Sequence, residues 1–482
     1  MNTTSRRSAP PGLVLAICCL SLLLVSLDIT IVNIALPAIR TELHASLSGL
    51  QWTIDAYTLV LATLLMLSGS LGDRLGRRRV FQTGLVLFTM GSLLCSVAPS
   101  LGWLVGFRAL QAVGGSMLNP VAMAIIVNTF VEPRARARAI GVWGAVVGLS
   151  MALGPVVGGV LVTSIGWRSI FWLNVPIGLA ALVLTRMFVP ESRAEHARAL
   201  DPAGQVLIVV LLGGLTYGII EAPNRGWLAP EIVGLFVAAL AAALLLVVVE
   251  RRRREPLINV LFFGSVPFAG ATLIAVAAFA ALGTFLLLNT LYLQNVRGYS
   301  PVVAGLLTLP MALMAAVCSA LSGRLVAARG PRLPLILAGI AMTLGAALLV
   351  PLSAQTPHAQ LLVAYTLIGV GFGLVNAPIT NTATAGMPRA QAGVAAAVAS
   401  TSRQTGSTLG VAVSGSLVAG ASTAGFAQAT HTAWGLVVGC GLVVLVLGIA
   451  TTGRWAAATA ARTRRLLESE EATRGNAVTA AV

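Results

Sequence analysis

The sequence has few charged residues and no lysine. Only 10% of its 482 residues are charged and 57% are hydrophobic, whereas a water-soluble domain has about 25% charged and about 45 to 50% apolar residues. We therefore expect a lipid bilayer to solvate most of the surface. All 31 basic residues are arginine, and both a Walker phosphate-binding loop and a pyridoxal phosphate Schiff base require lysine. The composition argues against a self-contained ATP-driven pump and a pyridoxal enzyme.

Cysteine is also scarce, and its five positions have no metal-ligand spacing and no disulfide-framework pattern. All five lie in apolar stretches: Cys18, Cys19, Cys95, Cys318 and Cys440. We interpret them as small core residues and expect neither a metal site nor an organic cofactor. The formal net charge of +16 would suggest nucleic-acid binding in a soluble protein, but the positions of the arginines indicate otherwise.

Apolar stretches of about 20 residues are long enough to cross a bilayer. The first starts near Leu13 and continues to about Pro37, too long for the apolar part of a cleaved signal peptide. The sequence predicts fourteen spans in all. They are 12–36, 52–71, 80–98, 102–128, 140–163, 168–188, 204–222, 230–249, 266–292, 302–322, 333–352, 359–380, 392–420 and 433–452.

The arginines agree with this count, because cytoplasmic loops of membrane proteins are enriched in basic residues. If the N-terminus is cytoplasmic, 25 of the 31 arginines lie in the tails and even-numbered loops. Four lie in odd-numbered loops, namely Arg40, Arg168, Arg225 and Arg297. The remaining two, Arg108 and Arg403, lie in predicted helices. We therefore predict that both termini are cytoplasmic and that the basic charge faces the cytosol and anionic lipid, without nucleic-acid binding.

A short internal repeat indicates two related halves. Gly69 and Gly76 follow the second span with the same spacing of seven as Gly323 and Gly330 after the tenth. We predict an N-terminal six-helix bundle at 12–188 and a C-terminal six-helix bundle at 266–452. Two inserted helices at 204–249 separate them, and cytoplasmic tails occupy 1–11 and 453–482.

The loop after the second span combines glycines with opposite charges. It contains Gly69, Asp73, Arg74, Gly76 and Arg77. The glycines permit a tight turn, and the acid can pair with an arginine or a helix N-terminus as a conformation-sensitive latch. An ordinary positive-inside turn would explain the arginines but not Asp73 or the glycine spacing.

Two predicted helices carry unusual residues. In the fourth span, Arg108, Gln111 and Gly115 share one helical face. A buried guanidinium needs a cavity or a partner, although an arginine near the helix end could also snorkel. In the fifth span, small residues form a close-packing stripe and a proline bends the helix, unless this is only a tightly packed helix. The positions are Gly141, Ser150, Gly154, Pro155, Gly158 and Gly159.

Two acids, Asp28 and Asp55, fall inside the first and second predicted spans. Desolvation favours a neutral carboxyl, so such a group can take up and release a proton as water access alternates. Asp28 is our first candidate for proton coupling and Asp55 the second. Asp28 could instead make a structural hydrogen bond at a helix break, and Asp55 could be a solvated acid at the extracellular end.

The loop and both helix motifs resemble those of the major facilitator superfamily, and across essentially the whole chain the flanking patterns resemble its fourteen-helix drug:proton antiporters. The chain departs from these patterns at Ala112 and Ser150, where glycine is usual, and has no acid between Pro301 and Leu321. The resemblance implies an all-α polytopic membrane protein, not an enzyme, in which Arg108 modulates proton release. The lack of a tenth-span acid favours a narrower or less charged substrate set.

The implied function is proton-driven efflux of small hydrophobic or cationic drugs or antibiotics across a bacterial cytoplasmic membrane, giving resistance. The alternative is a proton-coupled exporter or importer of an endogenous metabolite. We expect a monomer in the lipid bilayer, with protons and a small-molecule substrate as its partners. Polar and aromatic side chains within spans tend to face the bundle interior. The candidates for the substrate cavity are Asn33, Trp52, Tyr57, Gln111, Asn289, Asn376 and Arg403.

Overall fold

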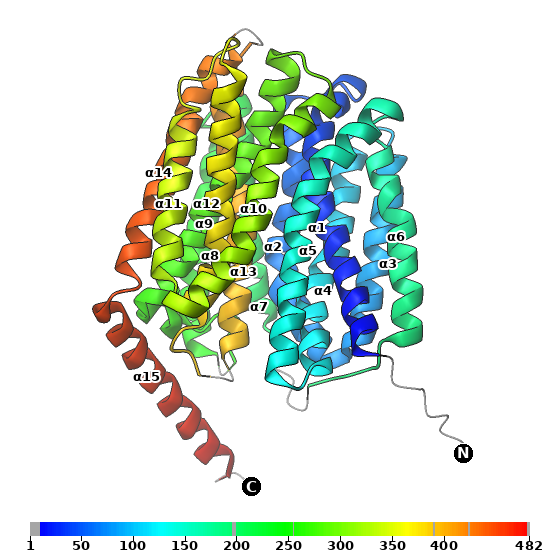
Figure 1. The fold of residues 1–482 in the computed structure, drawn as a ribbon. Coiled ribbons are helices and arrows are strands. Elements are labelled where there is room, and N and C mark those ends of the chain that lie inside the picture. Colours follow the sequence, from blue (N-terminus) through cyan, green and yellow to red (C-terminus); the bar gives the residue numbers. More distant parts are fainter. Residues whose placement is uncertain (1–9, 195–198, 254, 389–390, 423–424, 480–482) are drawn as a thin grey trace. The chain divides into compact units, whose positions relative to one another are not determined.

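The computed structural model describes residues 10–194, 199–253, 255–388, 391–422 and 425–479, and the described chain is helical (Figure 1). The first eight helices are α1 (Pro11–Glu42), α2 (Leu47–Leu75), α3 (Arg77–Ser96), α4 (Leu101–Thr129), α5 (Pro133–Ser164), α6 (Ser169–Phe188), α7 (Pro202–Arg225) and α8 (Pro230–Arg252). They are followed by the 3-10 helix η1 (Val260–Gly264), α9 (Val266–Leu291) and the π-helix η2 (Tyr292–Val296). The last six are α10 (Pro301–Arg329), α11 (Arg332–Ala347), α12 (His358–Thr384), α13 (Ala392–Leu417), α14 (Phe426–Ala450) and α15 (Arg454–Thr479).

Local sequence signals fix several helix ends. The Ser46 hydroxyl accepts a hydrogen bond from the Gly49 amide at the start of α2, and the Asp201 carboxylate does the same for Gly204 at the start of α7. Gly76 ends α2 with φ of +110°, and Gly330 follows α10 with φ of +76°. The second glycine of each copy of the predicted repeat thus occupies a backbone conformation that residues with a side chain rarely adopt.

The chain forms two compact units. The first comprises residues 1–200 and 290–312, and therefore contains α1 to α6, η2 and the first part of α10. The second comprises residues 201–289 and 313–482, and contains α7 to α9 and the helices from the rest of α10 to α15.

In the first unit, α4 packs against α2 and α3, while α1 packs against α5 and α6. Glycine allows the closest approach: a methyl group on Gly114 of α4 would lie 2.3 Å from the Phe88 amide nitrogen of α3. Phe81, Phe88 and Tyr57 are fully buried in the apolar core between these helices. The result is a closely packed support for any polar group buried on α1, α2 or α4.

In the second unit, α11 packs against α12 and α14, and α7 packs against α8 and α13. A methyl group on Gly410 of α13 would lie 2.2 Å from the Ala280 carbonyl oxygen of α9. The neighbouring Thr284 hydroxyl donates to the Gly410 carbonyl at 3.1 Å. Small residues therefore let α9 and α13 approach backbone to backbone, as in many membrane helix pairs.

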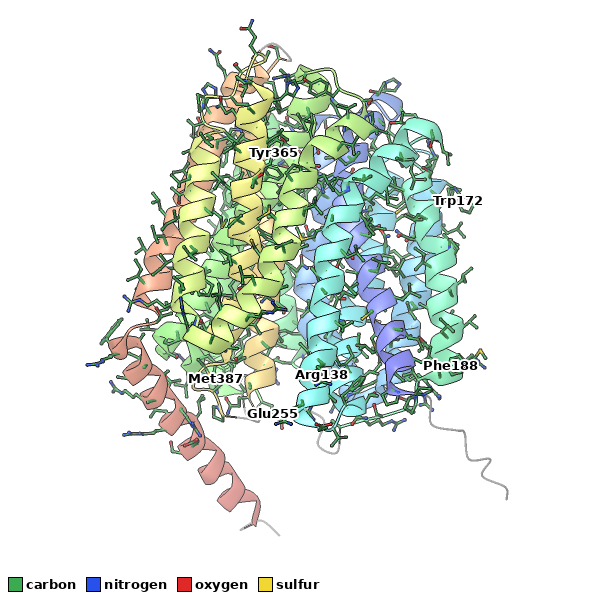
Figure 2. All side chains as sticks on the ribbon, in the orientation of Figure 1. Arg138, Trp172, Phe188, Glu255, Tyr365 and Met387 are labelled. Carbon is green, nitrogen blue, oxygen red and sulfur yellow. The ribbon has the colours of Figure 1, made fainter. Side chains whose placement is uncertain are left out.

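Apolar side chains cover much of the outer surface. Leu240 and Leu244 of α8 are each 62% exposed, and Trp172 of α6 points outward (Figure 2). Such a surface is unfavourable in water and favourable in lipid. Within the described chain, twelve helices are long and apolar enough to cross a membrane.

The predicted all-α class is confirmed, but the count of fourteen spans is not. The predicted span 333–352 corresponds to α11, which is apolar but has only 16 residues. The predicted span 392–420 corresponds to α13, which is not among the twelve and contains Arg403 and Gln404 among many Ser, Thr and Gly residues. Residues 1–9 of the predicted N-terminal tail lie outside the described residues.

Candidate proton-coupling site

The first unit holds a buried ion pair between α1 and α4. The Asp28 carboxylate of α1 and the Arg108 guanidinium of α4 are in direct contact, with side chains 0% and 1% exposed. Arg108 therefore does not snorkel to solvent. A charge pair this deeply buried is tolerated only when the geometry is good and further hydrogen bonds satisfy the remaining polar atoms.

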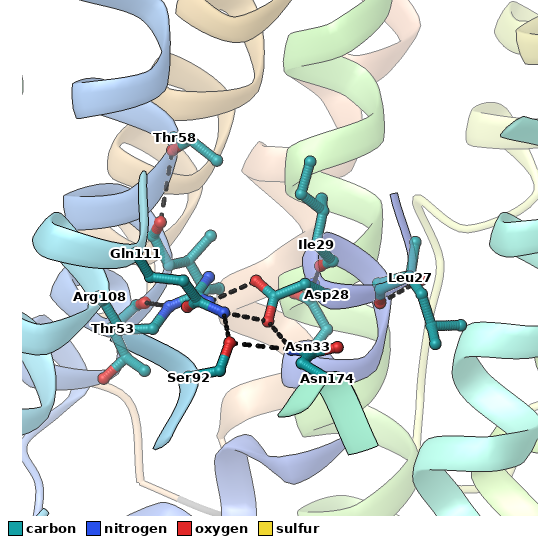
Figure 3. Close-up of polar contacts among 12 residues, drawn as sticks. Leu27, Asp28, Ile29, Asn33, Thr53, Thr58, Ser92, Arg108, Gln111 and Asn174 are labelled. Atoms are coloured by element: carbon teal, nitrogen blue, oxygen red, sulfur yellow. Dashed lines mark hydrogen bonds and ion pairs between the residues drawn. The ribbon is translucent and has the colours of Figure 1, made fainter. Parts of the chain in front are cut away.

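Gln111 of α4 and residues of two further helices, α3 and α6, supply some of those hydrogen bonds to Asp28 and its neighbours (Figure 3). Gln111 of α4 and Asn174 of α6 donate through their amide nitrogens to Asp28 Oδ1 at 2.8 and 2.9 Å. The Gln111 amide nitrogen also donates to the Ser92 hydroxyl of α3 at 2.7 Å. The side-chain oxygen of Gln111 accepts from Arg108 Nη1 at 2.6 Å. We call Asp28, Ser92, Arg108, Gln111 and Asn174 the Asp28 network.

Arg108 is held on its other sides by α2 and α6. Its Nε donates to the Thr53 carbonyl oxygen of α2 at 3.1 Å. Its guanidinium carbon lies 4.3 Å from the centre of the Tyr57 ring and 5.8 Å from that of Phe171. Because a desolvated cation over an aromatic face gains about 2 kcal/mol, the two rings help to compensate for its loss of water.

Close packing of α3 against α4 positions Gln111. A methyl group on Gly91 would lie 2.7 Å from both the amide nitrogen and the Cα of Gln111. Glycine at this position lets the two backbones approach until Ser92 can accept the Gln111 hydrogen bond. The network is thus built on helices rather than loops, which restricts the orientations of its side chains.

Asp55, the second acidic candidate, lies on α2 outside the Asp28 network. It is 0% exposed, so it is not a solvated acid. Its Oδ1 accepts from the Thr58 hydroxyl at 3.2 Å, and its Oδ2 has no hydrogen-bond partner among the described residues. Asp28 has three side-chain donors, one of which is the counter-charge Arg108, whereas Asp55 has one neutral donor.

The remaining cavity candidates lie in both units. In the first unit, Tyr57 contacts Arg108, and half-buried Trp52 lies five residues before Tyr57 on α2. Asn33 donates to the Ile29 carbonyl of its own helix at 2.8 Å. In the second unit, the Tyr365 hydroxyl of α12 donates to Asn289 of α9 (Tyr365 is labelled in Figure 2).

Asn376 and Arg403 meet in the second unit. Arg403 of α13 contacts the Thr380 hydroxyl and lies 3.5 Å from the Asn376 carbonyl oxygen, both on α12. The Asn376 side chain donates to the Phe372 carbonyl at 3.3 Å. The two candidates are therefore neighbours, although they are 27 positions apart in the sequence.

The predicted latch residues form contacts at the α2 to α3 turn. Arg77 donates through Nε and Nη2 to Asp73 Oδ1 at 3.1 and 2.9 Å. Gly76 makes the turn between them, while Arg74 is exposed. Gly69 makes no tight contact, since an added methyl would lie 3.8 Å from Pro120.

Glu191, in the segment after α6, also binds this turn and was missed by sequence reasoning. Its carboxylate accepts from the Arg78 amide at 3.0 Å and lies within 3.9 and 3.7 Å of the Arg78 and Arg79 guanidinium groups. The Arg77 amide donates to the Ser192 carbonyl at 2.9 Å. In the sequence, Glu191 looks like an ordinary loop acid after an apolar span. Nothing near it indicates that it binds Arg78, which is 113 positions away.

The small residues of α5 make contacts of different kinds. Methyl groups on Gly154 and Gly158 would clash with Thr30 and Ile31 of α1, at 2.0 and 2.6 Å. One on Gly159 would lie 2.7 Å from the Pro301 carbonyl at the start of α10.

Pro155, Ser150 and Gly141 complete the predicted stripe on α5. The Pro155 carbonyl oxygen would lie 2.3 Å from a methyl on Gly305 of α10. Ser150 is buried and donates to the Val146 carbonyl at 2.7 Å, whereas Gly141 is exposed and faces open space. The stripe therefore packs α5 against α1 and the first part of α10, and Gly141 takes no part.

Ser92, Asn174 and Thr53 were not selected from the sequence as site residues. Ser and Asn occur in many membrane helices, so only their contacts reveal a role. Ser92 is 0% and Asn174 1% exposed, and buried polar groups are normally satisfied by partners. Among the described residues, no group of His, Cys, Asp and Glu side chains is arranged to hold a metal ion.

Ionisable residues within membrane helices mark substrate or ion pathways, proton relays, voltage sensors or ligand counter-ions. The family model of the Major Facilitator Superfamily matches residues 18–411, and the chain belongs to this superfamily.

Relatives from bacteria are similar to this chain over most of their length. The chain is 39% identical to the Multidrug resistance protein Stp of Mycobacterium tuberculosis, over 83% of this chain and 74% of the relative. It is 38% identical to the Tetracenomycin C resistance and export protein of Streptomyces glaucescens, over 82% and 74%. It is 33% identical to the Methylenomycin A resistance protein of Streptomyces coelicolor, over 85% and 86%.

Solved structures share the fold at low sequence identity. A D-xylose-proton symporter matches with a TM-score of 0.66 and 15% identity, over 90% of this chain and 97% of that one. A bacterial homologue of the lysosomal transporter Spinster, in an inward-facing and unoccupied conformation, matches with a TM-score of 0.63 and 17% identity, over 97% and 99%. These structures show the shared fold, while the family model, the curated relatives and the twelve apolar helices of the described residues identify the chain as a multi-pass membrane transport protein.

Proposed function

We propose that this protein exports small drugs or antibiotics from a bacterial cytoplasm in exchange for protons, and that Asp28 is the carboxyl that couples the two movements. The names of its relatives, which include multidrug and antibiotic resistance proteins, support the drug export. The buried contact between Asp28 and Arg108 is the observation that supports proton coupling at this site.

The coupling follows from the hydrogen bonding of Asp28. As a carboxylate it accepts from Arg108, Gln111 and Asn174. Adding a proton removes the negative charge, so Arg108 loses its counter-ion and the contacts that join α1, α4 and α6 must rearrange. Protonation is therefore linked to a change of helix packing, which is the requirement for alternating access.

The turn and the α5 stripe have separate parts in this proposal. The Asp73 and Glu191 contacts hold the cytoplasmic turn between α2 and α3 in one conformation. The small residues of α5 let it pack closely on α1, which carries Asp28, so movement of α1 is transmitted to α5. Both termini are cytoplasmic in this proposal, the two six-helix bundles are the moving parts, and the protein acts as a monomer in the bilayer.

The driving force is sufficient for resistance. One proton entering down the membrane potential supplies about 2.3 kcal/mol per 100 mV. Because about 1.4 kcal/mol corresponds to a tenfold ratio, one proton exchanged for one neutral drug molecule supports roughly 40- to 50-fold depletion of the drug from the cell.

The test measures proton release from acid-loaded proteoliposomes on addition of hydrophobic antibiotics or cationic dyes. We compare the wild type with Asp28→Asn and use Asp55→Asn as the matched control, because both acids are fully buried and only Asp28 contacts Arg108. We expect substrate-dependent release in the wild type and in Asp55→Asn, and none in Asp28→Asn.

Other outcomes would contradict different parts of the proposal. Release that survives in Asp28→Asn and disappears in Asp55→Asn would transfer the coupling role to Asp55. No release with any drug, together with release on addition of an endogenous metabolite, would replace drug export by metabolite transport with the same fold.

A further inference from the structure

The C-terminal half of the chain is free of acidic residues over an unusually long stretch. No Asp or Glu occurs between Glu255 and Glu468, a stretch that contains α9 to α14. Four arginines lie in these six helices, and Arg324, Arg329 and Arg332 are at or near helix ends. Arg403 alone is deep within a helix, near the middle of α13. No carboxylate from α9 to α14 can therefore neutralise it.

The described partners of Arg403 are all neutral. Its guanidinium contacts the Thr380 hydroxyl, lies 3.2 Å from the Ser400 hydroxyl and 3.5 Å from the Asn376 carbonyl oxygen. Its Nε is buried and has no hydrogen-bond partner among the described residues. The Arg403 side chain as a whole is part-buried.

This environment differs from that of Arg108, which is buried within α4. Arg108 has Asp28 as a counter-ion, two aromatic rings and a fully buried position. Arg403 has no charged partner in the described chain. Placing a guanidinium in a membrane helix without a counter-charge is costly, and a hydrogen bond between a guanidinium and an anion is about twice as strong as a neutral one.

We propose that Arg403 binds an anionic group of the transported molecule, such as a carboxylate or a phenolate. This proposal rests on the proposed function, since it assigns a chemical class to the exported substrate. A bound anion would accept a hydrogen bond from the Arg403 Nε and give the guanidinium the counter-charge that α9 to α14 lack. The substrate class then consists of aromatic or hydrophobic organic anions, rather than the cationic drugs that the intramembrane acids alone suggest.

The experiment measures equilibrium binding of two dyes to the full-length protein in nanodiscs by fluorescence anisotropy. Fluorescein and rhodamine 123 share a xanthene ring system and carry opposite charges. The variants are Arg403→Gln, Arg403→Lys and the control Arg297→Gln, which removes the same charge outside α13. No proton gradient is present, so failure of proton-driven export leaves this measurement interpretable.

We expect fluorescein to bind the wild type and Arg297→Gln equally. Its affinity should fall about tenfold or more in Arg403→Gln and less in Arg403→Lys, which keeps the charge but not the two-pronged geometry. Rhodamine 123 binding should not weaken in Arg403→Gln. Equal fluorescein affinity in Arg403→Gln, parallel loss of both dyes, or fluorescein binding no better than to empty nanodiscs would overturn the proposal.

Stabilisation by chloride distinguishes an inorganic anion from an organic one. If chloride raises the unfolding temperature of the wild type but not of Arg403→Gln, and fluorescein does not bind, Arg403 holds an inorganic anion. That result would overturn its assignment as a substrate-binding residue.

Discussion

Replacing Asp28 by asparagine should destabilise the protein more than the loss of one hydrogen bond would suggest. Asp28 Oδ2 faces Arg108, and Oδ1 faces the amide nitrogens of Gln111 and Asn174. Whichever way an asparagine is turned, its NH2 group meets a donor. Arg108 also keeps its charge in a position that is 1% exposed. Removing one partner of a buried ion pair costs about 3 to 5 kcal/mol.

The double variant Asp28→Asn, Arg108→Gln should recover part of that stability. Without the guanidinium, the Gln111 side-chain amide is free to turn and present its oxygen to the NH2 group at position 28. Replacing both members of a buried pair by neutral groups commonly costs far less than removing one. We therefore expect the sum of the two single losses of stability to exceed the loss in the double variant by about 2 kcal/mol or more.

The assay is unfolding of the purified protein in one detergent, for the wild type, both single variants and the double variant. Asp55→Asn serves as the control, because Asp55 accepts a hydrogen bond from Thr58 and makes no ion pair among the described residues. It should change stability by about 1 kcal/mol or less. Strictly additive losses in the Asp28 and Arg108 variants would refute the reasoning, since they would mean that the two charges do not interact.

Three further changes test the surrounding packing. Gly154→Val should lower the stability by about 1 to 3 kcal/mol, because the first carbon added at this position would lie 2.0 Å from the Thr30 hydroxyl. The control Gly141→Val faces open space and should leave the unfolding temperature unchanged. Gly76→Ala should destabilise by about 1 to 2 kcal/mol, measured in the same way, because φ is +110° at this turn. Glu191→Gln should slow substrate-dependent proton release severalfold at a stability cost of about 1 kcal/mol, and unchanged release would argue against a part for Glu191 in the conformational change.

The sequence predicted most of the helices, because a span of about 20 apolar residues is a strong signal. The prediction was weakest where a helix departs from that apolar composition. α11 has only 16 residues, and α13 carries Arg403 among Ser, Thr and Gly. The count of spans depends on those two helices, and their hydropathy does not decide it.

The candidate site was predictable as a set of charges but not as a set of contacts. Asp28, Arg108 and Gln111 were selected because charged and amide groups are rare within spans. Nothing in the sequence pairs Asp28 with Arg108, 80 positions away, or with Asn174, 146 positions away. Tertiary packing creates these contacts, and Gly91 shows how, since it permits the approach of α3 to α4 that brings Ser92 to Gln111.

The two units therefore differ in their electrostatic design. In the first unit, the buried arginine has its own carboxylate, which balances its charge. In the second, Arg403 has neutral partners, and the sequence from 256 to 467 offers no acid to balance it. If the Asp28 pair responds to protons and Arg403 to an organic anion, then proton and substrate act on separate residues, and exchange requires coupling through helix movement rather than competition for one carboxylate.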